Sequence, residues 1–410
     1  MDIYKCRFCN CDINKIFVDL GITPLSNSFL KYENLNKPEK KYPLKAFVCE
    51  NCFLVQIPEF ETPDKIFSEY AYFSSYSKSW LQHVENYVNF ISKKNNLGKE
   101  SLVIELASND GYLLQFFKKN RIPILGIEPA ANVAKVAKDK GIRTIVDFFG
   151  EKLAHKLSKE DLKADLIIGN NVLAHVPNIN DFVKGMNILL KSNGTINIEF
   201  PHLLQLIKYN QFDTIYHEHF SYLSLYTVKK IFEFHNLTIF DVEEIPTHGG
   251  SLRIYAKHVA NKNFEIKNSV SEILEKERHF GLLDLSIYLK FLKTIESIKK
   301  ELVNFFHNAK QNNKKIVCYG AAAKGNTLLN YCGIGKEYVE YVVDKNPHKQ
   351  GLYLPGSHFP IKEPTEIEKT KPDFVVILPW NIKDEIMNEI SFIRDWGGKF
   401  VIPIPKVAIV

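Results

Sequence analysis

The segment around residue 217 carries side chains suited to proton transfer. Two histidines, His217 and His219, flank Glu218, and tyrosines lie on both sides at Tyr216 and Tyr222. The order differs from the H-E-x-x-H of zinc proteases, and histidines two residues apart would diverge on a helix. In an irregular segment, Glu218 can orient an imidazole while His219 moves a proton, because the pKa of histidine lies near neutral pH. A polar surface patch is the alternative interpretation.

Two pairs of cysteines have the spacing of a metal site. Each pair is a C-x-x-C, and two such pairs fill the tetrahedral coordination of one zinc ion, leaving no open position for catalysis. The sequence therefore predicts a structural zinc bound by Cys6, Cys9, Cys49 and Cys52. Cys11, just beyond the first pair, could compete as a ligand. Free buried thiols or a redox pair are the alternatives.

A strand-turn-helix pattern at residues 101–129 predicts a nucleotide site. An apolar run at residues 102–104 leads into Glu105 and a small polar turn, residues 107–111, and a second apolar run ends in Glu128. Such a turn admits backbone N–H groups to a ligand, and the second acid suits ribose hydroxyls. The turn lacks the G-x-G-x-x-G spacing that admits a pyrophosphate, so S-adenosylmethionine (SAM) suits it best. An ordinary strand-helix turn is the alternative.

Later apolar runs bring more polar residues to the same rim. Residues 144–149, 164–168 and 194–200 are predicted strands, and ligands collect beyond the carboxyl ends of such strands. The predicted cofactor residues are Glu105, Ala107, Asn109, Asp110, Gly111, Glu128, Asp147, Asn170 and Asn171. His175 belongs to the same rim. For each of these residues, capping of a loop is the alternative role.

Two further motifs suit an anionic substrate. The stretch T-H-G-G-S-L-R at residues 247–253 suits an anionic group or a hairpin turn. At residues 320–325, G-x-A-x-x-G approximates a dinucleotide fingerprint, with Asp344 ending the next strand. Lys324 at the start of the helix would meet phosphates, so NAD and other nucleotide phosphates both stay open. The predicted substrate-binding residues are His248, Gly249, Ser251, Arg253, Lys324 and Asn326.

The remaining sequence describes the framework. The 410 residues suit two to three domains, and 45% apolar with 24% charged residues is ordinary for a globular protein. The net charge of +6 is spread along the chain, which does not favour nucleic-acid binding. We find no apolar stretch long enough for a membrane span and no apolar signal core, and we expect a cytoplasmic protein. The tyrosine-rich residues 63–80 predict either a lid or plain packing, residues 79–97 an amphipathic helix, and residues 261–312 a long helical connector.

Taken in order, these motifs resemble the SAM-dependent sugar C-methyltransferase family, which acts on nucleotide-linked 4-keto deoxysugars. The resemblance spans the whole chain: the double C-x-x-C, E-x-A-S-N-D-G, Y-H-E-H, T-H-G-G-S-L-R and G-A-A-A-K-G-N-T. It implies an α/β fold with a zinc-binding module at residues 1–65, a class I SAM-methyltransferase doubly wound sheet at 66–260, a helical connector at 261–311 and a Rossmann-like nucleotide-sugar domain at 312–410. In such a family the last domain helps to hold the nucleotide diphosphate and does not use NAD.

The resemblance also implies roles for individual residues. His219 resembles the general base and Glu218 its partner, Tyr216 and His175 line the sugar pocket, and Tyr70 is the lid tyrosine. The expected substrate is a nucleotide-diphosphate keto-sugar, dTDP-linked, that is deprotonated at C3. Three alternatives remain: a SAM-dependent O- or N-methyltransferase of a sugar or other small molecule, a zinc-ribbon protein that binds or modifies RNA, and an inactive SAM-binding scaffold.

Overall fold

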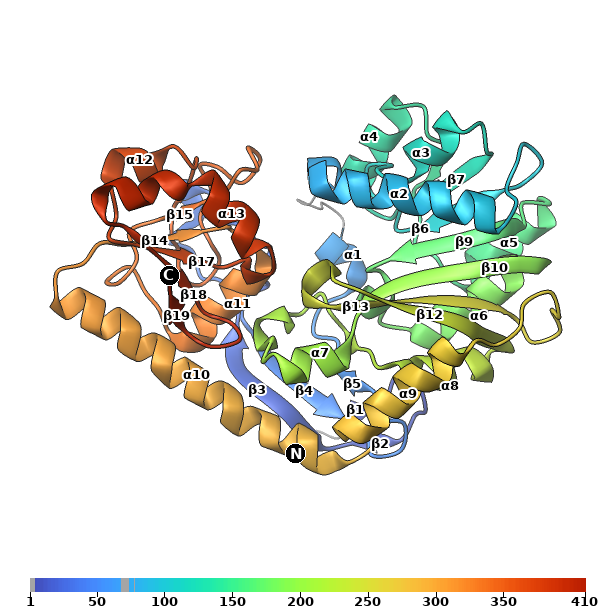
Figure 1. Cartoon of the computed structure of the whole chain (residues 1–410), viewed down its shortest axis with the longest axis horizontal. Coiled ribbons are helices and arrows are strands. Elements are labelled where there is room, and N and C mark those ends of the chain that lie inside the picture. The colour runs from blue at the N-terminus through green and yellow to red at the C-terminus, as the bar shows by residue number, and fades with distance from the viewer. Residues whose placement is uncertain (1–3, 68–73, 77) are drawn as a thin grey trace.

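A computed structural model describes residues 4–67, 74–76 and 78–410. Figure 1 shows a central α/β body (cyan to yellow) beside a C-terminal α/β body (orange to red), with the strands of the N-terminal module beneath and between them. Within the described ranges, no helix combines the length and apolar character that a bilayer span requires.

The N-terminal module is built from short antiparallel strands. Its elements are β1 (Tyr4–Lys5), β2 (Asp12–Ile13), β3 (Lys15–Thr23), β4 (Tyr42–Val48), β5 (Val55–Gln56) and α1 (Pro63–Phe67). β5 also pairs with β11 (Ser221–Tyr222), which directly follows the Y-H-E-H motif, and the resulting sheet has the order β11-β5-β4-β3. The N-terminal module therefore shares a sheet with the segment predicted to do the chemistry.

The central body is a seven-stranded sheet in the order β12-β13-β10-β9-β6-β7-β8. Its strands are β6 (Val103–Leu106), β7 (Ile124–Ile127), β8 (Thr144–Ile145), β9 (Ala164–Asn170), β10 (Leu190–Pro201), β12 (Leu237–Ile245) and β13 (Ser251–His258). β8, β7, β6, β9 and β10 are parallel, and β13 is antiparallel to both of its neighbours. The strand order reverses between β6 and β9, where doubly wound sheets bind their ligands. The predicted class I methyltransferase sheet is confirmed.

Helices cover both faces of this sheet because its strands are apolar on both sides. Val103 packs with α2 (Lys78–Lys94) and α3 (Leu114–Lys119), while the next residue, Ile104, faces the opposite cluster with α5 (Glu151–Lys159), α6 (Ile179–Leu189) and α8 (Leu225–Phe234). α4 (Ala131–Asp139) and α7 (Leu203–Lys208) complete the body. The strand expected at residues 144–149 ends at Ile145, and Val146 and Phe148 beyond this sheet edge are exposed.

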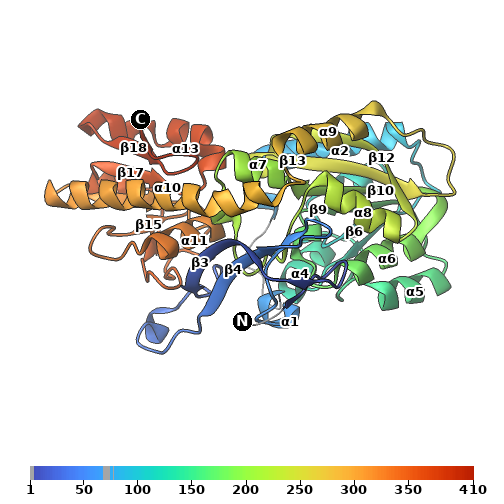
Figure 2. The same cartoon turned by 90° about the horizontal axis from the view of Figure 1, so that it is seen from below.

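The connector consists of two helices rather than one. α9 (Asn268–Phe280) ends at Gly281, whose φ of +96° breaks the helix, and α10 (Leu285–Gln311) then runs beneath the C-terminal body and against β3 (Figure 2).

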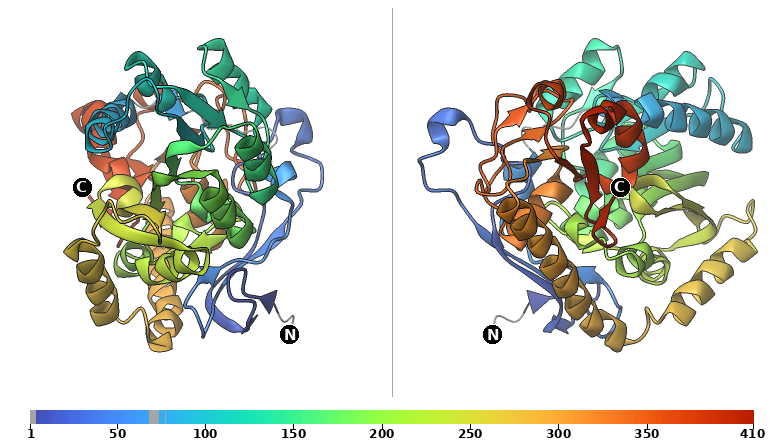
Figure 3. Two further views of the ribbon diagram at one scale, coloured as in Figure 1. Left: turned by 90° about the vertical axis from the view of Figure 1, so that its right-hand side faces the viewer. Right: turned by 60° about the vertical axis from the view of Figure 1, so that its left-hand side comes forward.

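The C-terminal body is a six-stranded sheet in the order β16-β15-β14-β17-β18-β19. Its strands are β14 (Ile316–Tyr319), β15 (Val342–Val343), β16 (Ile361–Lys362), β17 (Phe374–Ile377), β18 (Lys399–Ile402) and β19 (Ala408–Ile409), with helices α11 (Ala323–Cys332), α12 (Glu366–Thr370) and α13 (Lys383–Glu389). The long loop between β3 and β4 reaches this body (Figure 3), where Leu30 pairs with Tyr353 and Glu39 accepts the Gly356 N–H.

Candidate active site

His219 lies half-buried with both ring nitrogens hydrogen-bonded. Its Nδ1 is 2.9 Å from the carbonyl oxygen of Thr214, so Nδ1 carries the proton and donates it. Nε2 therefore holds the lone pair and accepts from the Tyr216 hydroxyl at 2.8 Å. Burial, and next the neighbouring His175, hold the pKa of His219 well below its ordinary value. The imidazole is consequently an uncharged base at neutral pH.

His175 completes this cluster from a different part of the chain. It ends η3 (Leu173–His175), the turn that follows β9, and its ring lies edge-on to that of His219 with 4.5 Å between centroids. Burial lowers the pKa of His175 to about 4. The structure thus brings together His175, Tyr216 and His219, whereas Tyr70, the expected lid residue, lies outside the described residues.

Glu218 points away from the imidazole that it was expected to orient. Its Oε1 accepts a hydrogen bond from the Asn27 side chain at 2.6 Å, and burial raises the pKa of Glu218 to about 7. The Thr214 carbonyl orients His219 instead. His217 is buried, and its Nε2 lies 3.2 Å from the Pro43 carbonyl, which is a packing position.

The predicted cofactor turn lies at the carboxyl end of β6, at the reversal of strand order. Ala107, Asn109 and Gly111 have positive φ angles, which folds the turn tightly back on itself. Glu128, at the end of β7, accepts the backbone N–H groups of Asn109 at 2.9 Å and Ala130 at 2.8 Å. This acid therefore fixes the backbone of the turn as well as facing the rim.

Glu105 is the buried acid of this rim. It is fully buried, and within the described ranges the Tyr112 hydroxyl is the side-chain donor that acts on its carboxylate. Burial raises the pKa of Glu105 well above its ordinary value, with the Tyr112 hydroxyl opposing the shift. A buried carboxylate of this kind requires a donor or a cation, and the ammonium group of SAM fits that requirement.

The other predicted cofactor residues do not all lie at the same place along the sheet edge. The Asp110 carboxylate lies 3.4 Å from the Lys140 ammonium, and Asn170 donates to the Tyr112 hydroxyl at 3.3 Å. Asn171 bonds His248 at 2.8 Å, which joins the cofactor rim to the T-H-G-G loop. Asp147 is exposed beyond the end of β8.

The T-H-G-G-S-L-R motif begins with η5 (Thr247–Gly249) and packs against the C-terminal body. The Arg253 guanidinium is already paired with Glu199 at 3.0 Å and Glu243 at 3.5 Å, and the Ser251 hydroxyl donates to the Thr247 carbonyl at 2.9 Å. These two side chains hold the loop in place. Burial lowers the pKa of His248 to about 4.

Gly249 marks the contact between this loop and the C-terminal body. A Cβ atom there would lie 2.6 Å from the Trp380 ring, so the indole fills the space that a side chain would need.

The contact between Gly249 and Trp380 forms a seam between the central and C-terminal bodies. Lys324 brings a positive charge from the C-terminal body to this seam. Its ammonium lies 3.1 Å from Asn381 Oδ1 and 4.7 Å from the centre of the Trp380 ring. Its charge contributes to the lowered pKa values of His219 and His248. Asn326, two residues further along α11, is fully buried and accepts a hydrogen bond from Asn330 within the same helix.

The four predicted zinc ligands meet at one point. Cys6 and Cys52 Sγ are 3.5 Å apart, as are Cys9 and Cys49 Sγ, and all four sulfur atoms lie within 4.8 Å of one another. Tetrahedral Zn–S bonds of about 2.3 Å would place the sulfurs about 3.8 Å apart, so the donor set fits zinc. The Gln56 amide donates to Cys6 Sγ at 3.2 Å.

Arg7, between the first two of these cysteines, links the predicted metal site to the segments that carry His175 and His219. It donates to the carbonyls of Ile57 at 2.5 Å and Pro177 at 2.6 Å, and it lies over the Phe220 ring. Pro177 and Phe220 are close in sequence to His175 and His219. Sequence reasoning missed Arg7. It also missed Asp213 and Trp380, which are joined by a hydrogen bond from the Trp380 indole N–H to Asp213 Oδ2. None of the three belongs to a motif with known chemistry.

Comparisons with known proteins cover all three parts of the chain. Family models described as "Putative zinc binding domain", "Methyltransferase domain" and "C-methyltransferase C-terminal domain" match residues 6–67, 79–242 and 246–405. The C-methyltransferase NovU of Streptomyces niveus is 34% identical over 409 residues, which are 100% of this chain and 97% of that protein.

Solved structures resemble a smaller part of the chain. A SAM-dependent methyltransferase from Anabaena variabilis is 16% identical with a TM-score of 0.36, covering 44% of this chain and 86% of its own. The magnesium protoporphyrin IX methyltransferase of Synechocystis with bound SAM is 15% identical with a TM-score of 0.33, covering 43% of this chain and 78% of its own.

Proposed function

The chain belongs to the C-methyltransferase family, and on that premise we propose that it methylates C3 of a nucleotide-linked 4-keto deoxysugar. The observation that carries the proposal is the His219 imidazole, which is uncharged, fixed in one tautomer and half-buried beside a tyrosine hydroxyl. Transfer to carbon needs a base, because carbon attacks a methyl sulfonium only after it has lost a proton. A neighbouring keto group makes that C–H acidic enough for an imidazole.

In the proposed reaction His219 Nε2 takes the proton from the carbon beside the keto group. The Thr214 carbonyl prepares the imidazole for this step, because a proton held on Nδ1 leaves Nε2 free to accept. After the transfer His219 is an imidazolium whose Nδ1–H still donates to Thr214. Its low pKa favours rapid return of that proton to solvent.

Three groups can stabilise the negative charge that develops on the keto oxygen. The Tyr216 hydroxyl donates to His219 in this structure, and in the complex it would turn to the substrate oxygen and release Nε2. His175 lies beside the same ring. The positive potential of Lys324, which lowers the pKa of His219, also favours an enolate at that position.

The predicted cofactors, SAM and a structural zinc ion, agree with the matched domains. When bound, SAM supplies an electrophilic methyl group. Glu105 would face its ammonium group, the turn at residues 107–111 would cover it, and Glu128 would reach the ribose. Asp147, Asn170 and Asn171 lie at or beyond the same strand ends. Cys6, Cys9, Cys49 and Cys52 would fill all four positions of a zinc ion, which would then hold Arg7 and β5 in place and leave no position for the reaction.

The nucleotide diphosphate, dTDP in this proposal, would lie along the seam with the C-terminal body. Lys324 is a cation at this place, its charge acts on His248, and Asn326 follows it on α11. Ser251 and Arg253 would act by holding the loop. We place the reaction in the cytoplasm, together with its nucleotide-linked substrate.

Hydrogen exchange at the acceptor carbon tests the proposal before any methyl group moves. A panel of nucleotide-linked 4-keto deoxysugars is incubated with the protein in D2O, first without SAM and then with it, and followed by mass spectrometry. We expect deuterium to enter next to the keto group, and the SAM reaction to add one methylene to the product. The matching 4-hydroxy sugars serve as controls and should stay unchanged. Methylation of those controls, without exchange in any keto-sugar, would instead indicate transfer to oxygen.

A further inference from the structure

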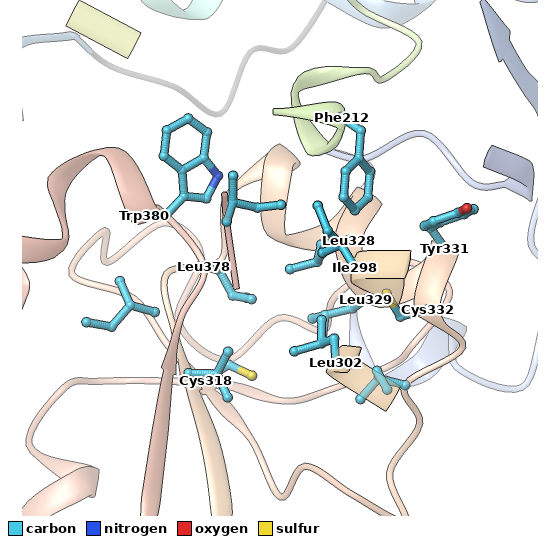
Figure 4. Close-up of a cluster of buried hydrophobic side chains, with 14 of the residues drawn as sticks. Phe212, Ile298, Leu302, Cys318, Leu328, Leu329, Tyr331, Cys332, Leu378 and Trp380 are labelled. Carbon is cyan, nitrogen blue, oxygen red and sulfur yellow. The ribbon is translucent and has the colours of Figure 1, made fainter. Parts of the chain in front are cut away.

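The segment that carries the base is packed into the C-terminal body rather than into the SAM-binding sheet. It begins with η4 (Phe212–Thr214), and Phe212 is fully buried in the same hydrophobic cluster as Leu328, Leu378 and Tyr331. Figure 4 shows the Phe212 ring entering this cluster, and its centroid lies 5.4 Å from that of Tyr331, edge to face. The backbone before His219 is therefore anchored to α11.

The next residue adds a directed bond between the same two parts. Asp213 is fully buried, and its Oδ2 accepts the indole N–H of Trp380 at 2.7 Å. Trp380 begins η6 (Trp380–Ile382), the turn after β17, and its ring packs on Gly249 and beneath Lys324. A buried carboxylate strongly resists the loss of such a donor, because the charge of Lys324 and the Thr214 N–H would then have to compensate for its desolvation.

The residue after Asp213 is the one that orients the base. The Thr214 carbonyl accepts the Nδ1–H of His219, and the Thr214 hydroxyl donates to the Gln211 carbonyl at 2.7 Å. The Ile215 carbonyl in turn accepts from Thr327 on α11 at 3.2 Å. The orienting carbonyl is thus flanked on both sides by bonds to the C-terminal body.

We propose that Asp213 and Trp380 form a positioning pair for the base: the Trp380 N–H holds Asp213, and Asp213 holds the Thr214 carbonyl that sets the tautomer and direction of His219. Neither residue touches the reacting atoms. The inference rests on His219 as the base of the proposed reaction, and it makes the C-terminal body part of the proton-transfer machinery as well as a place for the nucleotide.

The test compares Trp380→Phe with Trp396→Phe. Both changes remove an indole N–H that donates to a buried or half-buried acceptor, but Trp396 donates to the Pro372 carbonyl, away from the seam. We expect Trp380→Phe to lower kcat about 10- to 100-fold, because small misplacements of a reacting group cost this much. The SAM dissociation constant should stay unchanged, and Trp396→Phe should keep the wild-type kcat. Equal losses of kcat in both variants would overturn the proposal.

The imidazole itself provides a second measurement that does not depend on turnover. In protein labelled with ¹⁵N-histidine, the His219 signals are assigned by their loss in His219→Asn. Wild-type protein should show the Nδ1–H tautomer, and Trp380→Phe should show both tautomers. An unchanged tautomer in Trp380→Phe would contradict the proposal. If no keto-sugar exchanges its hydrogen with wild-type protein, the proposed function fails, while this measurement still decides the positioning role.

A double-mutant cycle distinguishes loss of the Asp213–Trp380 hydrogen bond from a general destabilisation of the surrounding structure. Asp213→Ala and Trp380→Phe should each lower kcat, and the double variant should fall no further than either one, because both changes remove the same hydrogen bond. Asp213→Asn keeps an oxygen that can accept the indole N–H and should restore most of the rate. Losses that multiply in the double variant, or an Asp213→Asn variant as slow as Asp213→Ala, would overturn the pair. Asp213→Asn also serves as the test if Trp380→Phe does not fold.

Discussion

Two strand-to-helix turns of this chain have the same local structure but differ in the polar groups around them. The first, at residues 107–111, joins β6 to α3, and the second, at residues 320–322, joins β14 to α11. Each follows a central strand of a doubly wound sheet, and in each an acid from the neighbouring strand accepts a backbone N–H of the turn. Glu128 binds Asn109 N–H at 2.9 Å, and Asp344 binds Ala321 N–H at 2.8 Å.

The two turns differ in their other polar groups, apart from the acid that accepts the backbone N–H. At the first turn, Glu105 is fully buried, no cation within the described ranges pairs with its carboxylate, and burial raises its pKa well above the ordinary value. At the second turn, Lys349 donates to the Ala321 carbonyl at 2.8 Å and lies 3.9 Å from Asp344, while Gly320 packs directly on Pro379. The second turn therefore satisfies its own polar groups, and its helix presents Lys324 to the seam. Glycine spacing alone does not distinguish a turn that receives a ligand from one that packs.

Replacing the base is expected to have the largest effect and to leave both turns intact. His219→Asn should lower methyl transfer by about 10²- to 10⁴-fold, the usual contribution of a general base. SAM binding, measured by calorimetry, should stay within about twofold of the wild-type value. His217→Asn is the matched control in the same motif and should retain methyl transfer, because His217 is packed against the N-terminal module and bonds the Pro43 carbonyl. Equal losses in the two variants would contradict the assignment of the base.

The acid limb of the pH profile follows from the same residue. His219 acts when it is unprotonated, and its pKa is held well below the ordinary 6.5. The value of kcat/KM should therefore rise with pH only below 6.5 and be level from there to neutral pH. A limb centred at or above pH 6.5 in wild-type protein would show that another group limits the rate.

Changing one acid at each turn tests the comparison directly. Glu105→Gln should weaken SAM binding about 10- to 100-fold, the value of a hydrogen bond to a charged group. Asp344→Asn should leave SAM binding unchanged and lower stability instead, because it weakens bonds to Ala321 and Asn346 N–H groups. Calorimetric titration and thermal unfolding of both variants measure the two effects. Weaker SAM binding in Asp344→Asn would contradict the division of roles.

A methyl group at Gly320 tests how tightly the second turn is packed. Gly320 has a φ of +94°, and an added Cβ would lie 2.5 Å from the Pro379 ring. Gly320→Ala should therefore lower the free energy of unfolding by about 1–3 kcal/mol. Gly98→Ala, where nothing lies within 4 Å of the new atom, should leave stability nearly unchanged. Denaturant unfolding of both variants provides the measurement.

The last expected effect depends on pH and concerns Glu218, whose pKa is also influenced by the charge of Lys349. Because its pKa is raised to about 7 in the folded protein, the folded state binds more protons than the unfolded state above about pH 4.5. The stability of the wild-type protein should therefore fall as pH rises from about 4.5 to 7. Glu218→Gln keeps the acceptor for Asn27 and removes this dependence. Its stability relative to the wild-type protein should increase by about 2–3 kcal/mol across that interval, as measured by denaturant unfolding at each pH.

Much of the framework follows from local patterns. The C-x-x-C pairs predict the metal site, and apolar runs alternating with helical spacing predict the parallel strands and their polar rim. Edges and breaks were less predictable: residues 146–149 leave the sheet because β8 has a partner on one side only, and Gly281 divides the expected connector.

The sequence by itself determined which residues have the chemistry for this site: the thiolates, the acids at strand ends and the histidines of the Y-H-E-H motif. Tertiary structure alone decided their partners. Glu218 bonds Asn27 although it precedes His219, and the carbonyl of Thr214, five residues earlier, orients the imidazole. Trp380 reaches Asp213 across 167 residues, and Arg7 reaches Pro177 across 170. Spacing along the chain reflects local geometry, whereas contacts of this separation form only when distant parts of the chain pack against one another.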